Sequence, residues 1–329
     1  MPEVRIDPLT GQRAIVAGDR AGRPGGGLSA TPAEPIDPES DPFAEGHEDR
    51  TPPEVYAVRP NGGEPNTPGW SVRVVPNLYP ALSPESAQPP PHANPDLFWA
   101  GPAAGDHEVI VNSPRPVISL AELAVEDVQG AVEVWRERIR VHRDSACVHL
   151  IVNERREAGA SLPHTHAQLY ALDFVPAAIA RERERFGAYA TKTMGSNLLG
   201  DLVQEEVRQR ERIVAIDEES VLMAPYGSRV PFQLMIAPRT PRMRFEDDGP
   251  IGAAMLHDAL RRLGSVLGAI APLSLWIRTA PQGSEHFCWR IDVLPRIPGV
   301  LAYGGLAAGA GLSFNPVSPE AASAVLRDV

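Results

Sequence analysis

The chain has 329 residues, of which 43% are hydrophobic, so it can bury a sizeable core and form about two domain-sized units. Its formal net charge of −11 argues against a nucleic-acid partner, because phosphate backbones are bound by clustered Lys and Arg. Only Cys147 and Cys288 occur, without a CxxC pair, so a disulfide scaffold or a thiolate zinc site has almost nothing to be built from.

The N-terminus carries no apolar stretch typical of a signal peptide, and no run of about 18 apolar residues occurs later in the chain. We therefore expect a cytoplasmic protein without a membrane partner. The 35 prolines are too many for helices and strands alone. They cluster in residues 24–53 and 84–95, which we predict to be loops or extended linkers.

A series of strand, helix, strand and strand patterns follows these linkers. Residues 107–116 form an apolar strand pattern that ends in prolines. Ser119 and Glu122 then make a capping box for a helix whose apolar residues recur at helical spacing. Two more strands are predicted over residues 148–153 and 164–172.

The second half of the chain repeats this series, with a strand over 231–241, a helix over about 251–267 and strands over 273–279 and 288–295. Pro114 and Pro238 are 124 positions apart, and so are His164 and Cys288. An internal duplication explains this spacing, and chance similarity of common α+β patterns is the alternative. We predict an N-terminal unit over 1–172, a helical connector with mixed charge over 173–215 and a C-terminal unit over 216–329.

The first copy contains the polar motif GASLPHTHAQ (159–168). If residues 164–172 form a strand, His164, His166 and Gln168 project from the same face. The small residues before them form a turn whose N–H groups can approach a phosphate. A neutral imidazole can attack phosphorus and form a phosphoramidate, and Gln168 can donate to a non-bridging oxygen. A metal-chelating pair and solvent-facing histidines are the alternative interpretations.

This motif resembles the Gly-x-Ser-x-Pro-His-x-His-x-Gln motif of galactose-1-phosphate uridylyltransferases and their relatives, the adenylyl-transferring sugar phosphorylases, within the histidine-triad superfamily. The resemblance covers nearly the whole chain. Residues 5–24 are similar to the family's opening strands, 41–55 to its zinc loop, 74–82 to its nucleotide-binding strand and 287–296 to its second-copy strand. It implies an α+β fold of two fused histidine-triad-like units, with a mainly antiparallel sheet and packed helices.

The resemblance also implies a role for individual residues. His166 is the expected nucleophile in the first unit, and the second unit has none. Gln168 is expected to contact the transferred phosphate, and His164, without a zinc ion to bind, is expected to hydrogen-bond the local backbone and to orient His166. The residues expected to bind substrate are Arg20, Arg23, Asn77, Asn153, Gly159 and Ser161.

The chain departs from the family at its metal positions. The four zinc positions read Asp41, Ala44, Pro116 and His164, and the positions of a second metal, described as iron in some members, include Pro241, Cys288 and Arg290. A structural zinc site needs about four donors, so we predict that the protein holds no zinc, no iron and no other cofactor. His47 together with Asp41 leaves a rearranged zinc site open.

The resemblance implies a nucleotidyltransferase that moves a nucleoside monophosphate, with UMP favoured, from a nucleotide sugar to a sugar 1-phosphate or another phosphate acceptor. It also implies a homodimer that shares sites. The family's Gly-Phe-Glu segment near the sugar falls on residues 305–307, which read GLA, so the expected acid is missing and the second substrate stays open. The alternatives are an adenylyl-transferring sugar phosphorylase, a nucleotide hydrolase and a non-catalytic nucleotide-binding paralogue.

Overall fold

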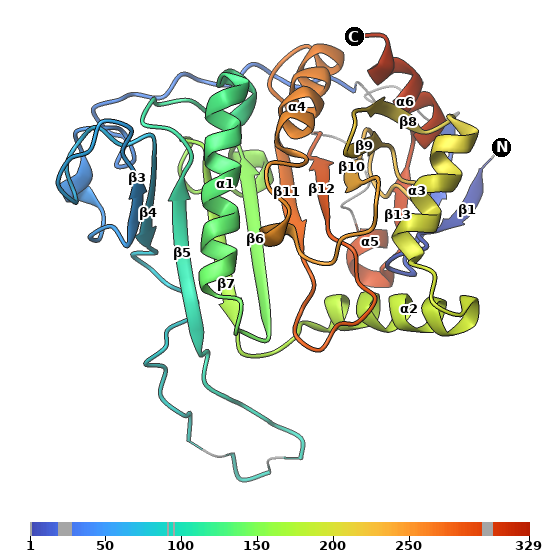
Figure 1. Cartoon of the computed structure of the whole chain (residues 1–329), viewed down its shortest axis with the longest axis horizontal. Coiled ribbons are helices and arrows are strands. Elements are labelled where there is room, and N and C mark those ends of the chain that lie inside the picture. The colour runs from blue at the N-terminus through green and yellow to red at the C-terminus, as the bar shows by residue number, and fades with distance from the viewer. Residues whose placement is uncertain (1, 19–27, 91, 95, 298–304) are drawn as a thin grey trace.

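The computed structural model of the protein describes residues 2–18, 28–90, 92–94, 96–297 and 305–329. Its described strands form a ten-stranded sheet and a three-stranded sheet (Figure 1). Every neighbouring pair in the larger sheet is antiparallel. In spatial order its strands are β3 (Tyr56–Val58), β4 (Val72–Pro76), β5 (Gly105–Val111), β7 (His166–Leu172), β6 (Cys147–Glu154), β11 (Leu273–Arg278), β12 (Arg290–Pro295), β10 (Leu234–Pro238), β9 (Ser220–Met223) and β8 (Ile213–Ile216).

The larger sheet consists of two halves with the same connections. The strand order is β3-β4-β5-β7-β6 in one half and β8-β9-β10-β12-β11 in the other, and the halves meet where β6 pairs with β11. Helix α1 (Val125–Val141) connects β5 to β6, and α4 (Ala253–Leu267) connects β10 to β11. The predicted α+β fold with a mainly antiparallel sheet is confirmed. The repeated connections support units over 1–172 and 216–329, a division that we retain as a proposal.

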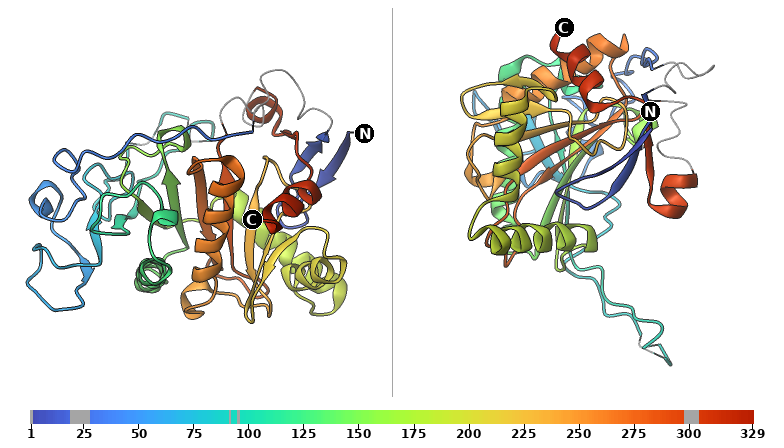
Figure 2. Two further views of the ribbon diagram at one scale, coloured as in Figure 1. Left: turned by 90° about the horizontal axis from the view of Figure 1, so that it is seen from above. Right: turned by 90° about the vertical axis from the view of Figure 1, so that its right-hand side faces the viewer.

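Helices α1 and α4 lie side by side on one face of this sheet (Figures 1 and 2). Their apolar sides and the strand residues that face them form the main core, in which Trp135 of α1 is fully buried. On β7, Ala167 and Leu169 face this core. Because side chains alternate along a strand, His166 and Gln168 face the opposite side of the sheet.

Helices α2 (Ala177–Thr193) and α3 (Leu198–Gln209) pack on that opposite side, over the second half of the sheet. Phe186 of α2 and Leu199 of α3 share a buried cluster with Met235 of β10, whereas the neighbouring Ile236 faces α4. These two helices occupy the predicted connector 173–215, and β8 begins within its last residues. The connector therefore covers only one half of this face.

The smaller sheet joins the two ends of the chain. It contains β1 (Glu3–Ile6), β2 (Arg13–Val16) and β13 (Ser313–Asn315), and β13 runs parallel to β2. The remaining described helices are η2 (Glu48–Arg50), η3 (Leu120–Glu122), η4 (Arg156–Ala158), η5 (Phe245–Asp247), α5 (Gly305–Ala310) and α6 (Pro319–Arg327). Among the described helices, none has the length and apolar composition needed to cross a membrane.

Most predicted elements differ from the observed ones by a few residues at their ends; β10, for example, covers Leu234–Pro238 within the predicted 231–241. The capping box of Ser119 closes the short η3 turn, and α1 starts later because Leu123 and Ala124 are extended. Helix α4 begins after Gly252, which has a positive φ, so Ile251 lies outside it. Strand β7 begins at His166 rather than two residues earlier.

Candidate active site

His166 lies at the start of β7, on the sheet face opposite to α1 and α4. Loop residues Phe43 and Trp70 pack on this face of the first half, together with Val109 and Val111 of β5. The Phe43 ring meets the His166 ring edge-on, with ring centroids 5.2 Å apart. His166 is only 6% exposed. Its Nε2 has no hydrogen-bond partner in the described part of the chain.

A single hydrogen bond determines which nitrogen of His166 can react. Its Nδ1–H donates to the main-chain oxygen of His164 at 2.7 Å. A carbonyl oxygen can only accept, so the proton is on Nδ1 and the lone pair of the neutral ring is on Nε2. Burial lowers the pKa of His166, which favours the neutral ring. The side chain therefore presents an uncharged nitrogen nucleophile.

The His164 ring lies before the strand and is held at both nitrogens. Its Nδ1 is 2.6 Å from Oδ2 of Asp41, and its Nε2–H donates to the Ser113 main-chain oxygen at 2.8 Å. Asp41 is itself fixed, because its Oδ1 accepts the Phe43 N–H at 3.0 Å. His164 thus ties three chain segments together, and its carbonyl group holds the His166 ring.

The residue between the two histidines is anchored from the other side of the sheet. Trp135 Nε1–H donates to Asn112 Oδ1 at 3.0 Å, and Asn112 Nδ2 donates to Thr165 Oγ1 at 3.2 Å. The Thr165 N–H donates to the Val117 carbonyl oxygen at 2.8 Å. The α1 core therefore fixes the point at which β7 begins.

The other predicted phosphate-contacting residues surround the turn before β7. Asn153 is on β6, and a Cβ atom built on Gly159 would lie 3.9 Å from its Nδ2. Gly159 has φ +94°, a conformation that L side chains rarely adopt. Ser161 is exposed. It lines a cavity of about 620 Å³ together with Arg156 and other side chains from the segments 31–35 and 155–163. The turn is therefore open to a ligand.

Gln168 and Asn77 meet at a residue that the sequence does not single out, His107 of β5. His107 Nε2 lies 3.1 Å from Gln168 Oε1 and 3.2 Å from Asn77 Nδ2. The Tyr170 hydroxyl also donates to Gln168 Oε1, at 2.9 Å. The pattern HEVIVN predicts a strand, but only the observed register, which sets His107 opposite Tyr170, brings these groups together.

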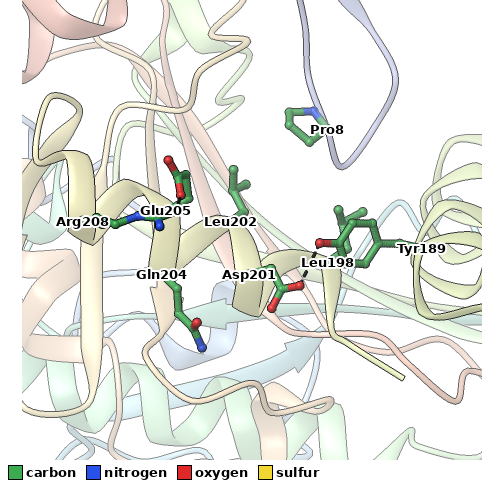
Figure 3. Close-up of a pocket in the computed structure, with 8 residues that line it drawn as sticks. All are labelled: Pro8, Tyr189, Leu198, Asp201, Leu202, Gln204, Glu205 and Arg208. Atoms are coloured by element: carbon green, nitrogen blue, oxygen red, sulfur yellow. Dashed lines mark hydrogen bonds and ion pairs between the residues drawn. The ribbon is translucent and has the colours of Figure 1, made fainter. Parts of the chain in front are cut away.

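Arg20 and Arg23, predicted to bind substrate, lie outside the described residues. A second cavity, of about 570 Å³, lies along α3 beside Pro8 (Figure 3). Tyr189 and Asp201 line it and are joined by a hydrogen bond of 2.7 Å. None of the predicted site residues lines this cavity, so we assign it no part in the chemistry.

Comparison with known proteins agrees with this geometry. A family model described as galactose-1-phosphate uridyl transferase, N-terminal domain, matches residues 1–176, more than half of the chain. The chain belongs to the galactose-1-phosphate uridylyltransferase family. Members are named as nucleotidyl-transferring enzymes, so the predicted family and enzyme class are confirmed.

Members of the family resemble this chain along most of its length. An ADP-glucose phosphorylase from Arabidopsis thaliana is 28% identical over all of this chain and 93% of its own length. A probable galactose-1-phosphate uridylyltransferase from Drosophila melanogaster is 28% identical over 87% of this chain and 80% of its own length. The crystal structure of an Arabidopsis thaliana ADP-glucose phosphorylase with bound ADP-glucose has a TM-score of 0.80 at 26% identity and covers 100% of this chain and 99% of that one.

The residues at the family's zinc positions do not fit a metal ion. Both nitrogens of His164 are engaged, so neither offers a lone pair to a metal. Ala44 and Pro116 have no side-chain donor atoms, which leaves too few ligands for a structural site. His47 Nδ1–H donates to the main-chain oxygen of Asp41 at 2.7 Å rather than facing its carboxylate.

The second set of metal positions is occupied by an ion pair. The Arg290 guanidinium lies between Glu182 of α2 and Asp292 of β12, with N–O distances of 2.9 Å to each. A permanently charged guanidinium is not a metal ligand. Burial raises the pKa of the Cys288 thiol to about 12, so this sulfur stays protonated. These residues fit a buried ion pair rather than a metal.

Proposed function

We propose that the protein transfers a nucleoside monophosphate from a nucleotide sugar to a phosphate-bearing acceptor through a covalent intermediate on His166. The Nδ1–H bond from His166 to the His164 carbonyl carries this proposal, because it leaves the lone pair of a neutral ring on Nε2. Family membership supports the same class of reaction. The full set of Asn153, Ser161, His166 and Gln168 argues against a non-catalytic paralogue.

The reaction takes two steps, and each step exchanges one bond. In the first, the Nε2 lone pair of His166 attacks the α-phosphorus, a nitrogen–phosphorus bond forms, and the bond to the bridging oxygen breaks, so the sugar phosphate leaves. In the second, an acceptor oxygen attacks the same phosphorus and the nitrogen–phosphorus bond breaks. The Nδ1–H stays bonded to the His164 oxygen throughout and stabilises the charge on the substituted ring.

The nucleotide donor is tested with labelled compounds. We expect UDP-glucose to leave an acid-labile, base-stable label on His166, and we expect His166→Ala to leave none. Absence of label with UDP-glucose, ADP-glucose and ATP alike would contradict the proposed intermediate. Full activity of His166→Ala would contradict it as well.

Adenylyl transfer to inorganic phosphate is the second candidate. It is favoured by the relative named ADP-glucose phosphorylase, which aligns with the whole chain, whereas the Drosophila uridylyltransferase covers 87% of it. The two candidates predict different products. Label from ADP-glucose that is released by inorganic phosphate would support the phosphorylase, and label from UDP-glucose that is released by galactose 1-phosphate would support the uridylyltransferase.

We also propose that two copies of the chain associate, as the resemblance implies. The described part of the segment between β4 and β5 extends away from the body (Figure 1) and exposes Leu97, Phe98 and Trp99. Exposed apolar clusters of this kind are typical of interaction sites. Light scattering should give twice the chain mass of 35.5 kDa, and a fully active monomer would contradict the proposal.

A further inference from the structure

His107 is a buried histidine that the two reaction steps above leave without a role. It is 8% exposed and stacks on Tyr170 of the neighbouring strand, with ring centroids 4.2 Å apart. Both of its ring nitrogens contact residues of the candidate site or the loop beside it. Its position and its partners therefore suggest more than packing.

The partners of the ring determine its tautomer. His107 Nδ1 accepts the main-chain N–H of Ala81 at 3.1 Å. An amide N–H can only donate, so Nδ1 carries the lone pair and Nε2 carries the proton of the neutral ring. Burial lowers the pKa of His107, which keeps the ring neutral. The Nε2–H therefore donates to Gln168 Oε1 at 3.1 Å. The Asn77 amide nitrogen, 3.2 Å from the same Nε2, is also a donor, so it lies beside the ring without a hydrogen bond to this nitrogen.

This donor fixes the direction of the Gln168 amide. Its Oε1 receives two hydrogen bonds, from His107 Nε2 and from the Tyr170 hydroxyl. The flipped amide would bring its NH₂ group against the Nε2–H, two donors facing each other. Tyr170 and His166 flank Gln168 on the same face of β7, one on each side. With the oxygen held by His107 and Tyr170, the NH₂ group is the part of the Gln168 amide left to donate to a ligand on this face.

We propose that His107 is a positioning residue for nucleotidyl transfer, which holds the Gln168 amide so that its NH₂ group donates to the phosphoryl group attacked by His166. This inference rests on the proposed function. His107 also holds the loop after β4, because its Nδ1 binds Ala81 and its carbonyl oxygen accepts the Asn77 N–H at 2.9 Å. One ring thus connects the phosphate donor with the loop that carries Asn77, which is predicted to bind substrate.

Two conservative substitutions separate these two contacts. His107→Gln places an amide NH₂ where Nε2 lies and keeps the donor to Gln168, but it loses the acceptor for Ala81. His107→Asn places an oxygen where Nδ1 lies and keeps that acceptor, but it loses the donor. We expect His107→Asn to lower kcat about 10- to 100-fold with little change in KM, because a misplaced phosphate donor weakens transition-state binding. We expect His107→Gln to raise KM and to keep kcat within about threefold.

The measurement is single-turnover labelling of His166 with whichever of UDP-glucose and ADP-glucose labels the wild-type protein. In a Gln168→Ala background, His107→Asn should slow labelling by less than about twofold, because the group it positions is gone. The matched control is His149→Phe, since His149 lies beside Tyr170 on the other neighbouring strand and should leave the rate within about threefold of wild type.

The outcomes separate this inference from the proposed function. No label on the wild-type protein with any donor would overturn both. Label on the wild-type protein with an unchanged rate in His107→Asn would overturn only the role of His107. Equal losses of labelling rate in His107→Asn and His107→Gln would show that His107 serves packing, and so would additive losses when His107→Asn is combined with Gln168→Ala. Either result would also overturn the proposed role of His107.

Discussion

The reactivity of His166 depends on whether its ring is protonated, and burial changes the pKa of this ring. Removing the ring from water disfavours its charged form and so lowers its pKa, while the hydrogen bond to the His164 carbonyl acts in the opposite direction. The net direction is downward. The neutral ring that attacks phosphorus therefore persists at pH values below the ordinary histidine pKa of about 6.5.

We predict that the labelling rate of His166 stays constant as the pH falls through about 6.5 and declines only at lower pH. The sign follows from the lowered pKa, because protonation removes the Nε2 lone pair only below that value. Single-turnover labelling between about pH 4.5 and pH 8 measures the midpoint. A midpoint above the ordinary histidine value would contradict the buried, neutral ring.

Asp41 should contribute to both stability and catalysis through His164. Asp41→Ala removes the partner of His164 Nδ1 and leaves a buried polar atom unsatisfied. We expect a loss of about 1–3 kcal/mol in unfolding free energy and slower labelling of His166. Urea unfolding and single-turnover labelling measure the two effects. Asp49→Ala, at an exposed position of the same loop, is the control and should change neither.

Sequence patterns predict part of this site and miss the rest for a physical reason. Alternation along a strand was enough to set His166 and Gln168 on one face. His164 lies before β7, which starts at His166, and its ring is hydrogen-bonded to Asp41 and Ser113 while it also meets the Phe43 ring. His107 could not be predicted as a partner of Gln168, since the register between β5 and β7 is set by packing that no local pattern records.

At the level of elements, the repeat was visible because each copy has the same spacing of prolines, helix and strands. The positions of β5, β6, α1 and their counterparts in the second half follow from apolar periodicity. Strands β8 and β9 were not predicted, and neither was the way α2 and α3 dock. Docking depends on contacts between distant segments, such as Phe186 of α2 with Phe287 before β12.

Helix α2 is attached to the sheet by a buried carboxylate. Glu182 accepts hydrogen bonds from Arg290 at 2.9 Å and from Arg278 at 3.3 Å. Burial alone would raise the pKa of Glu182, but the charges of these two arginines outweigh it and lower the pKa. The carboxylate therefore stays ionised and compensates two guanidinium groups.

We predict that Glu182→Ala destabilises the protein by about 3–5 kcal/mol, because it leaves Arg290 buried with less compensating charge. Urea unfolding measures the loss. Glu184 lies two residues further along the same helix and is exposed. Glu184→Ala should therefore lower the unfolding free energy by less than about 0.5 kcal/mol. Similar losses in the two variants would show that the effect comes from the helix itself and not from the buried ion pair.

For the whole molecule, the two halves of the sheet use the same face differently. In the second half, α2 and α3 cover the face that corresponds to the active face of the first (Figure 2). The position that corresponds to His166 carries Arg290, which is engaged with Glu182 and Asp292. In the first half, no α-helix of the described residues packs on that face, and His166 meets a loop. The same strand order therefore provides the proposed active face in one half and a face covered by helices in the other.

We predict that the purified protein holds neither zinc nor iron. At the zinc positions, Asp41 and Ser113 engage both nitrogens of His164 and link the same chain segments that a metal would link. We therefore predict less than about 0.1 zinc or iron per chain by elemental analysis, and an unchanged Tm after treatment with EDTA, since a structural metal would contribute to folding free energy. The triple variant Asp41→Cys, Ala44→Cys, Pro116→His restores a four-ligand set with His164 and is the positive control, which should bind zinc. Stoichiometric zinc in the wild-type protein would show that the hydrogen-bonded arrangement of His164 is not the one present in solution.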